Sequence, residues 1–273
     1  MFSLTHIIYM LIPLFAVLIL YFILRNRSDF VKKTVVFLIS ILNMLQHIFK
    51  PYIYPQYAGE SFGARSTAYN MCALLILISP IILLIGSELW RNFLFYIGSV
   101  SGYFAIISTY WLSEPIEEQL RFFGCHALLF LTSFLPILLG TVRINYRKFW
   151  RLPFVFYACL MILIINNIIT FELGLVGNTG EMTVYEFLVK ENPCWCMRPP
   201  ENYPFVEELV KIFTPGMFLA SEGGIDTPIL WYAFPLAILI GGGALFFGIN
   251  FDAKRFGRDI KNFFLKIFHL RGR

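Results

Sequence analysis

Long apolar stretches separated by short charged connections dominate the chain. A helix that crosses a bilayer needs about 20 mostly apolar residues, within a range of about 17–25. Seven stretches approach or reach this length, over Leu4–Leu24, Thr34–Phe49, Ala68–Ile85, Asn92–Leu112, Phe122–Thr141, Leu152–Phe171 and Ile229–Phe251. This pattern predicts an all-α, polytopic transmembrane helical bundle of about seven spans, forming a single domain over residues 1–273.

Composition supports lipid as the solvent for much of this surface. Of the 273 residues, 58% are hydrophobic and 14% are charged, whereas a soluble domain carries about 25% charged residues. Folded soluble proteins need polar cover at their surface, so a larger core does not explain the deficit. The net charge of +5 does not indicate a nucleic-acid partner, because the basic residues flank the apolar stretches. Such residues are typical of topology signals and of contacts with anionic headgroups.

The charged connections alternate in character along the chain. Basic residues follow the first, fifth and seventh stretches: Arg25, Arg27, Lys32 and Lys33; Arg143, Arg147, Lys148 and Arg151; and the basic tail over 252–273. The connections between them are acidic or mixed. The positive-inside rule then predicts an amino terminus outside and a cytoplasmic carboxyl-terminal tail. We expect an integral protein of a bacterial cytoplasmic (inner) membrane.

Residues 172–228 form the one long connection between apolar stretches. It contains Pro193, Pro199, Pro200, Pro204 and Pro215, and an apolar part over 205–219 that Pro215 and Gly216 interrupt. Loops of this length are usually functional or disordered. We predict an extracytoplasmic loop or lid, in which 205–219 is interfacial or re-entrant and does not form an eighth span.

Several polar residues are predicted to lie at one depth, near the outer face. Polar groups within spans are costly and usually face the bundle interior or a cavity. In the seven-span topology this layer contains His47, Asn70, Cys72, His126 and Asn166 or Asn167. A thiol beside an imidazole can become a nucleophile, because the ring accepts its proton. The asparagines and His47 could orient that ring or stabilise an oxyanion.

Less specific interpretations compete with this site. A cysteine in a span is more often a packing residue than a nucleophile, and Asn166 or Asn167 could only join helices. Cys125 is expected to be a poorer partner for His126, since adjacent helical residues do not face each other. Cys194 and Cys196 receive no role. The cysteine and histidine spacings indicate no metal site, and no cofactor is expected.

Two short motifs carry a family resemblance. Tyr69-Asn70-Met71-Cys72-Ala73-Leu74, followed by Ser79-Pro80-Ile81, and the later Phe122-Phe123-Gly124-Cys125-His126 resemble motifs of the YwaF-like integral membrane proteins. That family includes a human ether-phospholipid acyltransferase. The resemblance implies that Cys72 is an acyl-accepting nucleophile and His126 its general base. The chain departs from the family where Asn70 replaces a histidine and where Ala127 replaces a frequent glycine.

We therefore predict a membrane-embedded lipid acyltransferase or acyl hydrolase, with a membrane phospholipid or lysolipid as its substrate. A small-molecule transporter is the first alternative, although transporter sites tend to lie at the midplane within repeats. A receptor or assembly protein, in which the polar residues only pack, is the second. The sequence does not determine the oligomeric state.

Overall fold

The computed structural model describes residues 3–53, 66–107, 110–176, 182–197, 212 and 237–270. Within these ranges the chain is helical and contains no strand, so the predicted all-α class is confirmed for this part of the protein. The longer α-helices are α1 (Leu4–Leu24), α2 (Asp29–Ile48), α5 (Met71–Ile85), α7 (Ser99–Ile107), α8 (Ile116–Leu138), α9 (Leu152–Glu172), α13 (Gly243–Phe251) and α14 (Ala253–Leu270). Shorter helical segments are α3 (Lys50–Ile53), α6 (Glu88–Phe93), α10 (Val184–Glu191), the 3-10 turns Tyr110–Ser113, Tyr146–Arg151 and Pro193–Trp195, and the π-helical turns Leu94–Gly98 and Ala237–Gly242.

An N-terminal helical hairpin packs on the rest of the bundle. α1 coincides in its bounds with the predicted first stretch, and serine side chains cap both helices, Ser3 for α1 and Ser28 for α2. Such caps satisfy backbone N–H groups that have no partner within the helix. Fully buried His6 places its Nε2 atom 2.8 Å from the Ile106 carbonyl oxygen, which fixes α1 to the end of α7. The outer face of α1 is apolar and exposed, with Phe15 56% and Phe22 59% accessible, as expected of a lipid-facing helix.

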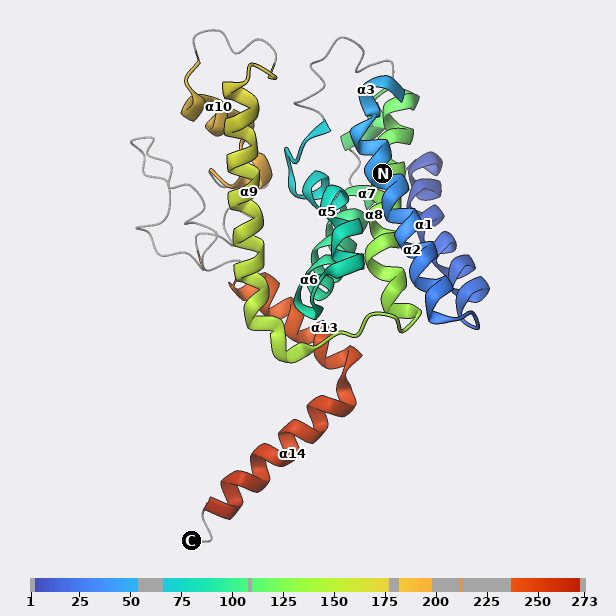
Figure 1. Ribbon diagram of the computed structural model, residues 1–273, viewed down its shortest axis with the longest axis vertical. Helices are drawn as coiled ribbons and strands as arrows, with labels where there is room; N and C mark the ends of the chain where they lie inside the picture. The colour runs from blue at the N-terminus through green and yellow to red at the C-terminus, as the bar shows by residue number, and fades with distance from the viewer. Residues whose placement is uncertain are drawn as a thin grey trace.

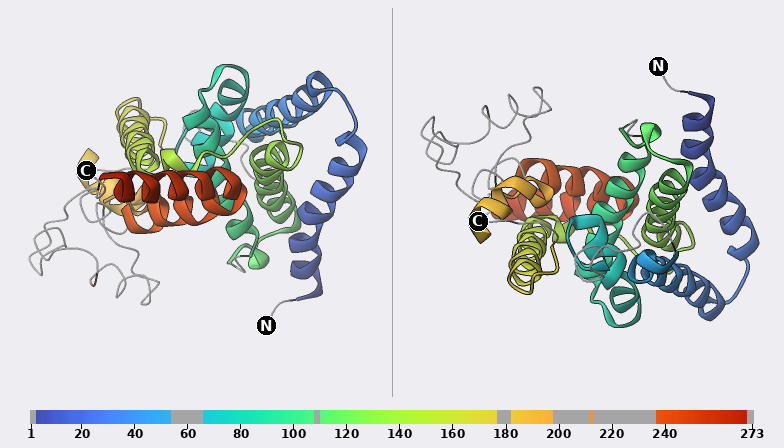
Figure 2. Two further views of the ribbon diagram at one scale, coloured as in Figure 1. Left: turned by 90° about the horizontal axis from the view of Figure 1, so that it is seen from below. Right: turned by 90° about the horizontal axis from the view of Figure 1, so that it is seen from above.

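Helix α8 is the central element. It packs against α1, α2, α5 and α7, and Figure 2 shows α9 with the C-terminal helices on one side, α1 and α2 on the other, and α5 to α8 between them. The segment from the π-helical turn into α7 approaches α8 closely at Gly98 and Gly102. The side chains of Ser99 and Ser133 hydrogen-bond across this contact with 3.0 Å between the two Oγ atoms.

The fourth predicted stretch is helical but not regular. α6, the π-helical turn Leu94–Gly98 and α7 follow one another from Glu88 to Ile107. π turns inside helices are rare and often mark functional sites or irregular packing. Here the turn brings Phe95 and Tyr96 into the core, where the Tyr96 hydroxyl donates a hydrogen bond to the Ala244 carbonyl oxygen of α13 at 2.9 Å.

Four helical segments are long and apolar enough to cross a membrane, at Leu4–Leu24, Asp29–Ile48, Ile116–Leu138 and Tyr146–Glu172. Met71–Ile85 and Ile240–Phe251 are apolar but shorter. The protein is therefore an integral membrane protein with several spans, while the count of seven and the orientation of the termini stay predictions. The apolar part over 205–219 lies outside the described residues, except for Ile212.

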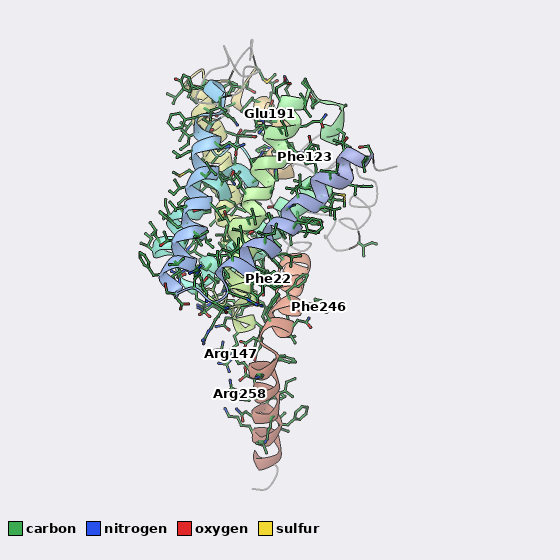
Figure 3. All side chains as sticks on the ribbon, turned by 90° about the vertical axis from the view of Figure 1, so that its right-hand side faces the viewer. Phe22, Phe123, Arg147, Glu191, Phe246 and Arg258 are labelled. Atoms are coloured by element: carbon green, nitrogen blue, oxygen red, sulfur yellow. The ribbon has the colours of Figure 1, made fainter. Side chains whose placement is uncertain are left out.

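The basic connections gather at one end of the molecule. Figure 1 shows the α1–α2 turn, the α8–α9 connection and α14 at the lower end, and α3 and α10 at the upper end. α14 extends away from the bundle, and Figure 3 shows Arg147 where this helix leaves it. We refer to these two sides as the basic end and the opposite end.

Candidate active site

The His126 ring is held by its own helix. Its Nδ1 atom lies 2.7 Å from the carbonyl oxygen of Phe122, one turn earlier in α8. A carbonyl oxygen can only accept a hydrogen bond, so Nδ1 must carry a proton and donate it. In the neutral ring this leaves the Nε2 lone pair available as the base. The side chain is 7% exposed and packs 4.2 Å from the Phe122 ring, measured between centroids.

The Cys125 thiol contacts the His126 ring, although adjacent residues on a helix were expected to point away from each other. Its Sγ atom is 3.4 Å from His126 Nδ1 and donates a hydrogen bond to Phe122 O at 3.2 Å. The expectation that adjacent helical residues do not meet was wrong here, because both side chains bend back to the same carbonyl oxygen. The thiol nevertheless faces the nitrogen that carries the proton. Cys125 is therefore poorly placed to lose its own proton to this ring.

Cys72 lies in the first turn of α5. Asn70 caps this helix: its Oδ1 atom accepts a hydrogen bond from the Ala73 N–H at 2.9 Å. Cys72 is consequently the second helical residue, where the positive end of the helix dipole stabilises a thiolate. The partly exposed thiol of Cys72 interacts with the His126 ring. The structure thus brings Cys72 and His126 together, and it assigns the oxygen of Asn70 to capping.

A second cysteine completes the surroundings of Cys72. The Met71 N–H donates a hydrogen bond to Cys194 Sγ at 3.0 Å, across from the 3-10 turn Pro193–Trp195. Cys194 has a left-handed backbone, with φ 53° and ψ 29°. Burial raises the pKa of the Cys194 thiol to about 12, so this sulfur remains protonated at neutral pH. The sequence assigned it no role, because nothing in the C-x-C spacing points to a contact 123 residues away.

The other predicted polar residues hold the segment that leads into α5. His47 Nε2 lies 3.1 Å from Thr67 O, and the His47 ring stacks on Tyr69. Asn166 donates to Thr67 Oγ1 at 3.1 Å, while Asn167 donates to Leu163 O at 2.8 Å and more weakly to Tyr69 O at 3.4 Å. These side chains gather around the start of α5, where they contact Thr67 and Tyr69. These contacts fix the segment that leads into α5, three to five residues before Cys72.

A polar stripe along α2 and into the start of α3 escaped the sequence analysis. Ser40, Asn43, His47 and Lys50 follow one another at helical spacing and are all buried. The Asn43 amide donates a hydrogen bond to the Cys125 carbonyl oxygen at 3.0 Å, which ties α2 to the helical turn that carries His126. Lys50 lies with its Nζ atom 4.7 Å from the Tyr69 ring centroid. The i, i+3, i+7 and i+10 spacing of polar residues in an apolar helix was the signal that could have found this stripe.

A buried ion pair lies one turn before the site. Glu118 and Arg121 precede the apolar stretch predicted from Phe122, but α8 begins at Ile116 and includes both. Arg121 Nε donates to a Glu118 carboxylate oxygen at 2.7 Å, and both residues are under 8% exposed. Mutual neutralisation makes burial of these two charges tolerable. α8 therefore begins six residues before Phe122, where the predicted apolar stretch starts.

Within the described ranges, no group of three or more histidine, cysteine or acidic side chains could hold a metal ion. The arrangement instead joins one partly exposed thiol, one ring with a fixed tautomer and a helix amino terminus.

Comparisons with known proteins give one finding. No curated protein and no solved structure matches the chain. The model of the TMEM164 family, a family of transmembrane proteins, matches residues 1–205. This range contains the helices that carry Cys72 and His126 and covers well over half of the 273 residues. The chain therefore belongs to the TMEM164 family.

Proposed function

We propose that the protein is a lipid acyltransferase or acyl hydrolase, with Cys72 as the nucleophile and His126 as the general base. The observation that carries this proposal is the interaction of the Cys72 thiol with a ring whose Nδ1 is already committed to Phe122 O. Such a ring has one nitrogen left to accept a proton, and it is held in place for that purpose.

In the first half-reaction, Nε2 of His126 takes the thiol proton and Cys72 Sγ attacks the carbonyl carbon of a lipid ester. An S–C bond forms, the ester C–O bond breaks, and the departing lysolipid oxygen receives the proton from His126. The first-turn position of Cys72 favours the thiolate, because the positive end of the helix dipole lies there.

In the second half-reaction, an acceptor hydroxyl gives its proton to His126 and attacks the thioester. The S–C bond breaks and Cys72 recovers the proton. A lysolipid acceptor gives acyl transfer, and water gives hydrolysis. Exclusion of water by the segment near Cys194 would favour transfer. If the positive-inside rule holds, the basic end is cytoplasmic and the ester is taken from the outer leaflet of the cytoplasmic membrane.

The test uses the full chain purified in detergent with a phospholipid that carries a labelled acyl chain and a lysolipid acceptor. Wild-type protein should form an acyl adduct on Cys72, detected by intact mass, and transfer the label. Cys72→Ala should lose both, and His126→Ala should reduce the rate about 10²- to 10⁴-fold. Cys125→Ala is the matched control: it removes the other sulfur beside the ring and should retain adduct formation on Cys72.

Retention of both adduct and transfer by Cys72→Ala would end the proposal. A transporter would instead show substrate uptake into proteoliposomes that survives this substitution. A receptor or assembly protein would tolerate the double substitution of Cys72 and His126 without any change of activity, provided that the protein still folds.

A further inference from the structure

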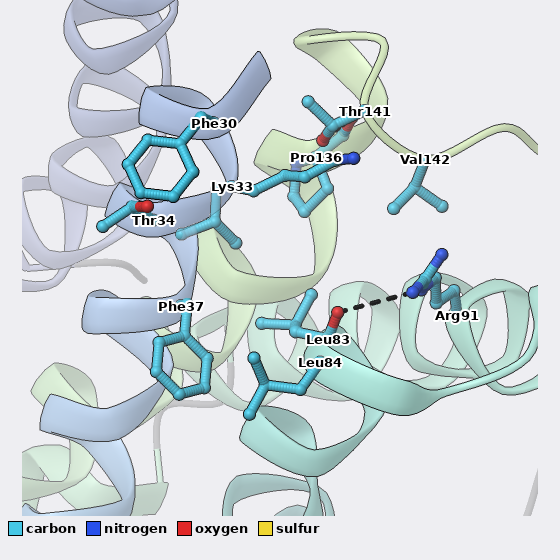
Figure 4. Close-up of a pocket in the computed structure, with 11 residues that line it drawn as sticks. Phe30, Lys33, Thr34, Phe37, Leu83, Leu84, Arg91, Pro136, Thr141 and Val142 are labelled. Carbon is cyan, nitrogen blue, oxygen red and sulfur yellow. Dashed lines mark hydrogen bonds between the residues drawn. The ribbon is translucent and has the colours of Figure 1, made fainter. Parts of the chain in front are cut away.

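A pocket of about 290 Å³ opens between helices at the basic end. It is lined by the amino-terminal part of α2, the last turn of α5, Arg91 of α6 and the carboxyl-terminal end of α8. Its apolar surface is formed by Phe37, Leu83, Leu84, Pro136 and Val142. Figure 4 shows these side chains with Lys33 and Arg91, which reach into the pocket from opposite sides.

Helix endings shape the pocket. α8 ends with Gly140 in a left-handed conformation, at φ +71°. The turn that follows places three donors on the Pro136 carbonyl oxygen: Thr141 N at 3.0 Å, Val142 N at 3.2 Å and Thr141 Oγ1 at 3.1 Å. This closes one wall of the pocket. On the other wall, Arg91 donates a long hydrogen bond of 3.5 Å to Leu83 O, which holds its guanidinium near the end of α5.

The charge of the pocket is positive. Lys33 and Arg91 both line it, and no acidic residue is among the described residues that do so. The nearest acidic residues in the sequence have other basic partners: Asp29 pairs with Lys32 at 3.7 Å, and Glu88 pairs with Lys148 at 2.6 Å. The hydroxyls of Thr34 and Thr141 add further hydrogen-bonding capacity. A ligand that fits must therefore carry an anion at one end.

The same ligand must also be apolar. A free phosphate would use the two cations but leave Phe37, Leu83 and Leu84 uncovered, and a neutral acyl chain would leave the cations without a counterion. Basic pockets between membrane helices on the cytoplasmic side are typical binding sites for anionic lipid headgroups. We propose that this pocket binds an anionic phospholipid from the leaflet at the basic end, with its phosphate between Lys33 and Arg91 and an acyl chain along Leu83, Leu84 and Pro136.

This site is distinct from the Cys72–His126 pair. Leu83 lies eleven residues after Cys72 in α5, so the two are separated by about 17 Å along the helix axis at a rise of 1.5 Å per residue. The proposal therefore does not depend on acyl transfer. A lipid bound here would join α2, α5 and α8 and stabilise the bundle, since a ligand that binds only the folded state raises its stability.

The experiment measures the thermal unfolding midpoint of delipidated full-length protein in detergent as dioleoylphosphatidylglycerol is added. A saturable rise is expected. Removal of one basic side chain should raise the lipid concentration at half-saturation about fivefold. Each basic residue near a membrane surface contributes roughly 1 kcal/mol to binding. Lys33→Ala and Arg91→Ala should each show this loss, and the double substitution the product of both. Arg27→Ala removes one exposed positive charge from the turn before α2, outside the pocket, so it is the control and should bind as the wild type does.

Two further arms separate the possible ligands. Dioleoylphosphatidylcholine should give little saturable rise, and inorganic phosphate at the same concentration should give none. The proposal is overturned if Lys33→Ala/Arg91→Ala binds the anionic lipid like the wild type, if both lipids bind equally, or if phosphate alone reproduces the effect. Should the double substitution fail to fold, Lys33→Gln decides the question, because this side chain is exposed and its replacement leaves the packing intact.

Discussion

The Nδ1 atom of His126 lies 2.7 Å from the carbonyl oxygen of Phe122, within the same helix. This contact determines which nitrogen carries the proton before any substrate binds. Elsewhere in the bundle the other nitrogen is used: Nε2 of His6 faces Ile106 O at 2.8 Å and Nε2 of His47 faces Thr67 O at 3.1 Å. When neutral, His126 is therefore expected in the opposite tautomer to His6 and His47.

Nitrogen-15 NMR of histidine-labelled protein tests this difference. In neutral rings the protonated and unprotonated nitrogens have well-separated chemical shifts. His126 should show a protonated Nδ1, and His6 and His47 a protonated Nε2. Spectra of His126→Asn and His47→Asn assign the signals. A protonated Nε2 on His126 would remove the base from the proposed mechanism.

Asn70 is predicted to act as a cap and not as a catalytic amide. Asn70→Ala should lower the free energy of unfolding by about 1 kcal/mol, the usual cost of losing such a side chain, and should reduce the activity because α5 frays at Cys72. Asn70→Ser should restore both, since serine is also a good N-cap. Thermal unfolding and acyl transfer are measured in parallel. Restored stability without restored activity would show that the amide itself takes part in the reaction.

Some of this architecture was readable from the sequence and some was not. Hydrophobic length located α1 at Leu4–Leu24, because a lipid-facing helix must be apolar along its whole length. α8 extends before the predicted apolar stretch to include Glu118 and Arg121, because these charges neutralise each other only after the helix has formed. The depth of His47 and Asn166 was inferred from topology, but their shared partner, Thr67, depends on the path of the chain before α5. Tertiary contacts of this kind leave no periodic pattern in the sequence from which they could be predicted.

Cys194 should react slowly with thiol reagents at neutral pH. Burial raises its pKa to about 12 from the usual 9.0, so almost no thiolate is present, and the thiolate is the reactive form. Its labelling by a maleimide should increase steeply only as the pH rises above 10. Because the pKa of this thiol is lower in the unfolded state, the unfolded state loses the proton at a lower pH than the folded state. The free energy of unfolding should therefore fall between pH 9 and 12. Mass spectrometry of labelled peptides gives the rate, and rapid labelling at pH 7 would contradict the burial.

Asp259 is predicted to hold α14 to the bundle. Hydrogen bonds from Arg147 and then from Tyr146 lower the pKa of its carboxyl to about 2. Because the folded pKa is depressed below 3.8, this contribution is complete above pH 5 and lost only as the pH falls towards 2. Asp259→Asn should speed tryptic cleavage between α13 and α14 by up to about fivefold at pH 8, the range for exposed ion pairs. Asp29→Asn removes a carboxylate whose partner is Lys32 in the first turn of α2, away from this junction, and should leave the rate unchanged.

Gly102 and Gly124 lie near the same helical turn, yet replacing each by alanine should have opposite effects. A Cβ at Gly102 would meet His126 O at 3.1 Å and Phe130 N at 3.1 Å, both backbone atoms of α8 that cannot rotate away. Gly102→Ala should therefore push α7 from α8, cost about 1–3 kcal/mol as overpacking does, and lower the activity by moving His126.

A Cβ at Gly124 would meet only the side-chain nitrogen of Gln46, at 3.9 Å. Gly124→Ala should consequently stabilise α8 by up to about 1 kcal/mol, the difference in helix propensity between the two residues, and leave the activity intact. Unfolding in detergent and acyl transfer of both variants provide the comparison. Equal changes of stability and activity in the two variants would mean that the close approach of α7 to His126 does not position the ring.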